Sequence, residues 1–196
     1  MKHTLLMLAA AASLVLVAPP GSAAVQTYKA SLTGSAEDPA NSSPATGSAV
    51  VQIDDVAHTM HLDVVFSGLL GTTSASHIHC CTAAPLTGTA GVATTVPNFP
   101  GFPLGVNGGI YNATLDLQAD GSYNPAFLSA HGGTPAGAEA ALLGGLAMQE
   151  AYLNIHTTSF PGGEIRGFLS PIPEPSAWAM LCLGIAGIGL YRRRRT

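Results

Sequence analysis

Two histidines and two cysteines stand within the short segment SHIHCC, residues 76–81. In an extended strand alternate side chains share a face, so His77 and His79 would point to the same side, about 7 Å apart. Two imidazoles at this spacing can bind one transition metal ion, and imidazole nitrogen suits copper and zinc. The segment therefore leads to the hypothesis of a copper or zinc site.

A third ligand is expected from His156, near the C-terminal end of the central region, and His131 in a Gly-rich stretch is a weaker candidate. The set His77, His79 and His156 is similar to the copper ligands of Cu/Zn superoxide dismutase, a Greek-key β-sandwich with a His-x-His pair and a later histidine. No histidine is placed to bridge two metals and no His and Asp set forms a zinc site, so the resemblance extends to three ligands and not to the dismutase reaction. Alternatively, these histidines hydrogen-bond within the sheet and join the last hairpin to the His-x-His strand.

The adjacent thiols of Cys80 and Cys81 allow three interpretations. Neighbouring Cα atoms lie about 3.8 Å apart across a trans peptide, which is less than the roughly 4.4–6.8 Å usual for a disulfide. A strained disulfide between them is the first interpretation, because an exported protein meets oxidising surroundings. Thiolate ligands for a soft metal ion are the second, and free or intermolecular thiols are the third.

The region between residues 25 and 170 is acidic. Its only basic side chains are Lys29 and Arg166, against ten acidic ones, which gives a net charge of −8. Such a surface offers no attraction to phosphate backbones, so nucleic-acid binding is excluded. No nucleophile elbow, phosphate-binding loop or zinc-protease motif is present. We therefore expect a protein that acts by binding or assembly and is not an enzyme.

The N-terminal residues 1–24 have the order of a secretory signal peptide. A basic start at Lys2 is followed by an apolar run and by small residues at 22–24. Cleavage there would begin the mature chain near Val25. The protein is therefore expected to be exported.

The C-terminal residues 171–196 combine a Pro-Glu-Pro motif, an apolar segment and an arginine cluster. The apolar segment is slightly shorter than the roughly 17–25 residues of a membrane helix, and the arginines mark its cytoplasmic end. These three parts resemble the bacterial PEP-CTERM sorting signal, which implies cleavage by an exosortase-type membrane protease and delivery to the cell surface or extracellular matrix. An uncleaved membrane anchor is the alternative. The motif residues are Pro173, Glu174, Pro175, Arg192, Arg193, Arg194 and Arg195.

Between these ends, short alternating apolar segments predict β-strands. A helix is expected from Pro135, with Thr134 as its N-cap. Short strands and frequent turns predict an all-β fold, an antiparallel β-sandwich or Greek-key barrel with one inserted helix, flanked by the signal helix and the C-terminal membrane helix. The predicted strands lie at 28–32, 49–53, 60–66, 74–81, 110–117, 151–157 and 164–169.

A stretch rich in Pro and Gly, residues 82–107, is expected to have no regular structure and to wrap an edge or cover a site. If Phe99, Phe102 and Tyr111 are exposed, they would allow a third function, the binding of small molecules or glycans. The alternative is that they pack into the core or the loop.

The segment YLNIHTTSFPGGEIRGFL, residues 152–169, carries a second resemblance. Together with the earlier HIH it resembles the CHRD domain, named after chordin and common in bacterial secreted proteins. The resemblance spans most of residues 28–169 and implies an extracellular module. It brings no catalytic residues. Within it, Glu164 and Arg166 stand two apart and are expected to share a strand face as a structural ion pair or cross-strand contact.

Overall fold

A computed structural model describes residues 25–172 of the 196-residue chain. The predicted signal peptide, the Pro-Glu-Pro motif, the C-terminal apolar segment and the arginine cluster from Arg192 to Arg195 lie outside the described residues. Within residues 25–172, no helix is both long enough and apolar enough to cross a membrane.

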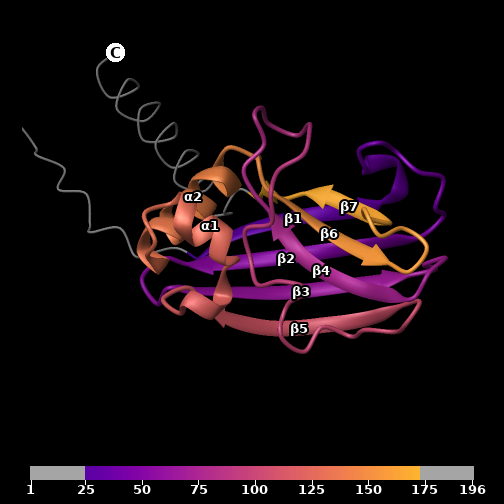
Figure 1. The fold of residues 1–196 in the computed structure, drawn as a ribbon, viewed down its shortest axis with the longest axis horizontal. Coiled ribbons are helices and arrows are strands. Elements are labelled where there is room, and N and C mark those ends of the chain that lie inside the picture. The colour runs from indigo at the N-terminus through magenta and orange to yellow at the C-terminus, as the bar shows by residue number, and fades with distance from the viewer. Residues whose placement is uncertain (1–24, 173–196) are drawn as a thin grey trace, which may run out of the picture.

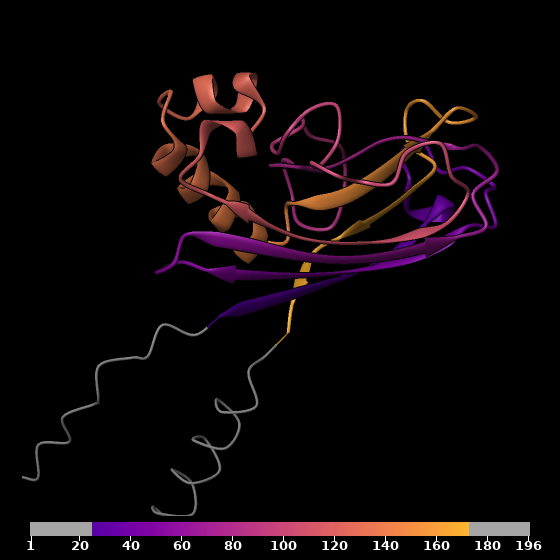
Figure 2. The same ribbon diagram turned by 90° about the horizontal axis from the view of Figure 1, so that it is seen from below.

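The described residues form one antiparallel sheet in the strand order β4-β6-β7-β1-β2-β3-β5, with the short β8 paired to β1. The sheet curls into a half-barrel, and the two α-helices lie over one end of it (Figures 1 and 2). The prediction of an all-β fold is confirmed. The elements are β1 (Gln26–Thr33), η1 (Gly34–Ala36), β2 (Thr46–Asp54), β3 (Thr59–Ser67), β4 (Thr73–His79), β5 (Gly109–Asp116), η2 (Asp120–Ser122), α1 (Pro125–Ala130), α2 (Pro135–Ala147), β6 (Tyr152–Thr157), β7 (Ile165–Phe168) and β8 (Ser170–Pro171).

The hairpin of β2 and β3 shows why these segments become strands. Every second residue is apolar and buried, and the register places Val51 opposite Leu62, both fully buried. At the turn, the Asp54 carboxylate accepts hydrogen bonds from the backbone N–H groups of Val56 (3.0 Å) and Ala57 (2.8 Å). Period-two alternation buries one face of the hairpin and leaves the other to solvent.

The predicted helix is confirmed as α2, which begins after Thr134. The Thr134 hydroxyl accepts a hydrogen bond from the N–H of Gly137 at 3.2 Å, which is the expected N-cap. The sequence did not predict α1, where the Asn124 side chain caps the N–H of Ala126 at 3.0 Å. Its six residues are too few to show a helical period.

The connection between β4 and β5 has no regular element, as predicted, but its residues Phe99 and Phe102 are buried, as is Tyr111 in β5. Phe99 is 0 % exposed and Phe102 and Tyr111 are 4 % exposed. The ring centroids of Phe99 and Tyr111 lie 5.8 Å apart, and those of Phe66 and Phe102 lie 5.5 Å apart. The alternative that these three aromatics pack into the core is therefore confirmed, because burying their large apolar area is favourable. The small-molecule or glycan function that required their exposure loses its basis.

Gly167 lies where the backbones of β7 and β1 approach each other closely. A Cβ atom at this position would overlap the backbone carbonyl oxygen of Ser31, and backbone atoms cannot move aside as a flexible side chain can. We expect Gly167→Ala to lower the free energy of unfolding by about 3 kcal/mol, measured by urea denaturation. The matched control is Gly144→Ala in α2, where a Cβ meets nothing within 4 Å and alanine should stabilise the helix by about 0.5–1 kcal/mol. Equal stability of the two variants would contradict this assignment.

Candidate metal centre

Pairing of β4 with β6 brings the three predicted histidines onto one face of the sheet. The antiparallel register places His77 opposite Asn154 and His79 opposite Tyr152, and His156 follows Asn154 by two positions. Residues two apart on a strand share a face. One nitrogen from each of His77, His79 and His156 lies within 4.8 Å of the other two.

In each of the three histidines, the hydrogen bond made by Nδ1 fixes which tautomer of the ring is present. A carbonyl oxygen can only accept a hydrogen bond, so each Nδ1 must carry the hydrogen, and in the neutral ring Nε2 is then an acceptor with a free lone pair. The three Nδ1–H groups donate to backbone carbonyls: His77 to Pro97 (2.9 Å), His79 to Ala90 (2.8 Å) and His156 to Pro161 (2.9 Å).

Each of the three Nε2 atoms is therefore left with a free lone pair. Nε2 of His77 lies 3.0 Å from Nε2 of His156, and Nε2 of His79 is buried without a hydrogen-bond partner. Two bare lone pairs at this distance repel unless a proton or a metal cation lies between them. Burial lowers the pKa of both His77 and His79 to about 4, so a proton is disfavoured at neutral pH. A metal ion would satisfy all three nitrogens.

Surrounding groups hold the His79 ring in place. The ring of Tyr152 stacks on it with centroids 4.7 Å apart and an angle of 7° between the planes, and the Arg166 guanidinium lies 4.7 Å from the centre of the Tyr152 ring. The N–H of Ala90 donates to the Tyr152 hydroxyl at 3.3 Å, while the carbonyl of Ala90 accepts from His79. Such outer contacts orient metal ligands before the ion binds.

The long connection supplies two of the three carbonyls that orient the histidines, those of Ala90 and Pro97. The connection therefore lies against the candidate cluster. The weaker ligand candidate, His131, does not join the cluster. It ends α1 and packs on Phe127, with ring centroids 4.3 Å apart.

The metal-free protein should lose stability on mild acidification. In the folded protein the pKa of His77 and of His79 is about 4, below the ordinary value of 6.5, and the pKa of His156 is lowered as well. The neutral histidines therefore stabilise the fold fully above pH 6.5, and this stabilisation is lost as the pH falls toward 4. Burial raises the pKa of Glu37 to about 7, so its contribution has the opposite sign and is lost as pH rises through 7. The pH dependence contributed by two or three histidines outweighs the opposite dependence contributed by the Glu37 carboxyl. We therefore expect the free energy of unfolding to fall by about 1–2 kcal/mol from pH 7 to pH 5.

Urea titrations of chelator-treated protein at the two pH values measure this change. Glu37→Gln removes the opposing contribution, so the fall should become steeper in that variant. A metal-free protein that is more stable at pH 5 than at pH 7 would contradict the assigned neutral histidines.

The two cysteines beside the cluster are joined to each other. The Sγ atoms of Cys80 and Cys81 form a disulfide with Cα atoms 3.0 Å apart, across a cis rather than the assumed trans peptide. The pair packs against Gly145 of α2, where there is no room for a Cβ beside the two sulfurs. In this structure the sulfurs are neither free thiols nor thiolate ligands, and among the described residues the candidate ligand set contains only the three histidines.

Glu164 and Arg166 do not form a pair, which corrects the expectation that they share a strand face. Strand β7 begins only at Ile165, so Glu164 lies in the preceding turn. The side chain of Arg166 instead lies beside Glu37, with Nε 3.9 Å from Oε2. The fully buried Glu164 carboxylate accepts hydrogen bonds from Ser43 Oγ (2.7 Å), Leu70 N (2.6 Å), Gly71 N (3.2 Å) and Thr157 Oγ1 (2.6 Å).

Comparison with protein-family models gives two matches. Residues 28–169 match the CHRD domain, and residues 171–195 match the PEP-CTERM protein-sorting motif. Neither the curated proteins nor the solved structures contain a significant match. The sorting motif marks an exported protein that is processed by an exosortase, with transient membrane anchoring and a surface or extracellular location. Since the first match spans well over half of the chain, the protein belongs to the CHRD domain family, with a PEP-CTERM sorting motif at its C-terminal end.

Proposed function

We propose that this exported protein acts by binding and not by catalysis, and that it binds a transition metal ion, copper or zinc, through His77, His79 and His156. The observation that carries the proposal is the cluster of three histidines, each with a ring nitrogen within 4.8 Å of the other two and a free Nε2 lone pair, one of them buried without any partner. Backbone carbonyls fix all three tautomers in the form that leaves Nε2 available to a metal.

The ligand set favours imidazole-binding metals. Three neutral imidazoles suit copper and zinc, whereas magnesium and calcium prefer oxygen ligands. Among the described residues no fourth His, Cys, Asp or Glu joins the cluster. A bound ion would therefore keep a coordination position for water or another small ligand, as three-histidine zinc sites do.

The sorting motif supports a role outside the cell. A protein delivered to the surface or the extracellular matrix meets metal ions and matrix polymers directly. We propose that the CHRD domain acts there in binding or assembly, with the metal centre as one of its binding sites.

Elemental analysis of the exported protein, purified without a histidine tag, tests the metal site. We expect close to one equivalent of copper or zinc per chain, and none in the double variant His77→Ala, His79→Ala. The matched control is His58→Ala, His61→Ala, which removes two histidines outside the cluster and should retain the metal. Circular dichroism checks that all three proteins are folded. The proposal is wrong if the parent protein neither contains nor takes up copper or zinc, or if the double variant retains the same amount.

A further inference from the structure

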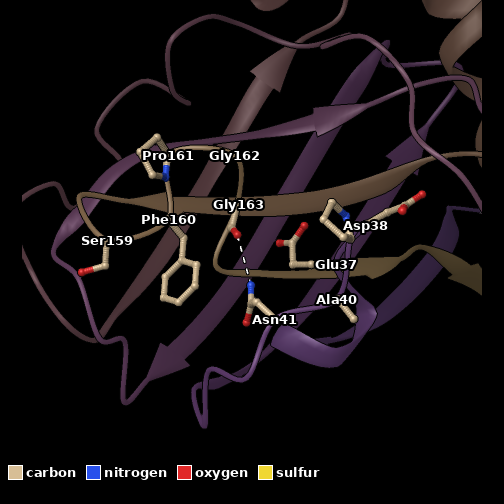
Figure 3. Close-up of a pocket in the computed structure, with 10 residues that line it drawn as sticks. Glu37, Asp38, Ala40, Asn41, Ser159, Phe160, Pro161, Gly162 and Gly163 are labelled. Atoms are coloured by element: carbon tan, nitrogen blue, oxygen red, sulfur yellow. Dashed lines mark hydrogen bonds between the residues drawn. The ribbon is translucent and has the colours of Figure 1, made fainter.

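A second candidate site lies next to the metal centre. A pocket of about 330 Å³ is lined by residues 37–41, which follow β1, and by residues 159–163, the turn between β6 and β7 (Figure 3). This volume is at the small end of the range of ligand sites, about 300–1,000 Å³. The carbonyl of Pro161 in this turn accepts the hydrogen bond from His156, so the pocket and the metal centre share a wall.

The pocket contains a buried acceptor that has no hydrogen-bond partner. Glu37 is only 9 % exposed and its Oε1 is unpaired, and the buried Oδ1 of Asn154 beside it is unpaired as well. A Cβ on Gly163 would lie 2.7 Å from Glu37 Oε1 and 2.8 Å from Asn154 Oδ1, so both acceptors meet at the Gly163 backbone. Leaving a buried acceptor unpaired is unfavourable, so a ligand with hydrogen-bond donors would satisfy this group.

At Glu37 the charge favours a neutral donor over a cation; Asp38 also lines the pocket, but its carboxylate points away from that of Glu37 (Figure 3). The Arg166 guanidinium nitrogen Nε lies 3.9 Å from Glu37 Oε2 and offsets the charge of the carboxylate. Burial also raises the pKa of Glu37 to about 7, which weakens its negative charge further. An ammonium group would gain little here, whereas hydroxyl groups supply donors without a charge.

The walls of the pocket complete a surface for a sugar ring. Phe160 is half-buried, and Pro39 and Pro161 add apolar surface. The side chain of Ser159 points away from Glu37 (Figure 3). A pyranose ring presents hydroxyl donors on its edge and C–H groups on its face. We propose that this pocket binds a neutral saccharide, with sugar hydroxyls donating to Glu37 and the face of the ring lying on Phe160. The neighbouring metal site is not required for this binding.

Saturation-transfer NMR on the exported protein, with methyl glycosides of glucose, galactose and mannose as probes, tests the pocket. We expect saturation transfer to at least one glycoside, in metal-free and metal-loaded protein alike. Phe160→Ala and Glu37→Ala should each weaken binding at least about tenfold, because each removes one of the two main contacts. Glu37→Gln retains an oxygen acceptor and should bind nearly as the parent does, so it serves if Glu37→Ala does not fold. Leu104→Ala, an exposed apolar residue outside the pocket, is the matched control and should bind normally.

Three outcomes would overturn the saccharide site: no transfer from any of the glycosides, unchanged binding in Phe160→Ala, or displacement of a bound glycoside by methylammonium chloride, which would identify a cation site. Because the measurement is made on metal-free protein as well, its failure is distinguishable from failure of the metal proposal.

Discussion

Replacing His79 by alanine is expected to lower the affinity of the exported protein for copper or zinc more than about 100-fold. Loss of a group that only orients a metal ligand costs about 10–100-fold, and His79 is itself one of only three ligands in the described cluster. Its Nε2 is the buried atom without a partner, so the remaining two histidines cannot replace it. Competition titration against a chromogenic chelator measures the affinity directly.

Two further variants separate ligand loss from general disturbance. His61→Ala on the outer face of the sheet should leave the affinity unchanged, because His61 contacts Thr114 and Asp63 and not the cluster. Tyr152→Phe retains the ring that stacks on His79 but loses the hydroxyl contact to Ala90, so its affinity should fall by about tenfold or less. If His79→Ala binds metal as tightly as His61→Ala does, the three-histidine site is wrong.

Replacing Glu164 by alanine is expected to lower the free energy of unfolding by about 3–5 kcal/mol. The carboxylate is fully buried and connects two separate segments of the chain, at Ser43 and at Leu70 and Gly71, to the last hairpin, within which it also bonds to Thr157. Its removal would leave two backbone N–H groups, of Leu70 and Gly71, without a partner, and each buried unsatisfied donor costs about 1–3 kcal/mol. Urea denaturation at pH 7 measures the loss.

Glu164→Gln should cost less than the alanine variant, because the amide retains one acceptor oxygen, and Asp55→Ala at an exposed turn should change little. Burial alone would raise the pKa of Glu164, but the hydrogen bonds from Thr157, Leu70, Ser43 and Gly71 outweigh it and lower the pKa. The stabilising contribution of Glu164 is therefore fully present above its ordinary pKa of 4.5, and it is lost as the pH falls through the lower pKa of the folded state. An alanine variant as stable as the Asp55 variant would contradict this structural role.

The amino-acid sequence alone determined the features that depend on neighbouring residues. Alternating apolar residues located the strands, and the Thr134 cap located α2, because both patterns express local backbone periods. The same period placed His77 and His79 on one face of β4. The PEP-CTERM motif gave the destination of the protein, since a sorting signal is read as a contiguous segment.

Only the tertiary structure decided how distant residues combine. His77 and His156 are 79 positions apart, and strand pairing brings their Nε2 atoms together. The carbonyls that fix the tautomers belong to loops whose course depends on packing, and packing also decided that Phe99 is buried, which the sequence had left open. Glu37 gave no signal in the sequence, because its environment is created by Arg166 and Asn154 from the far end of the chain. Strand and helix periods can be read from neighbouring residues, whereas the candidate metal centre and the pocket result from contacts between segments that only the folded sheet brings together.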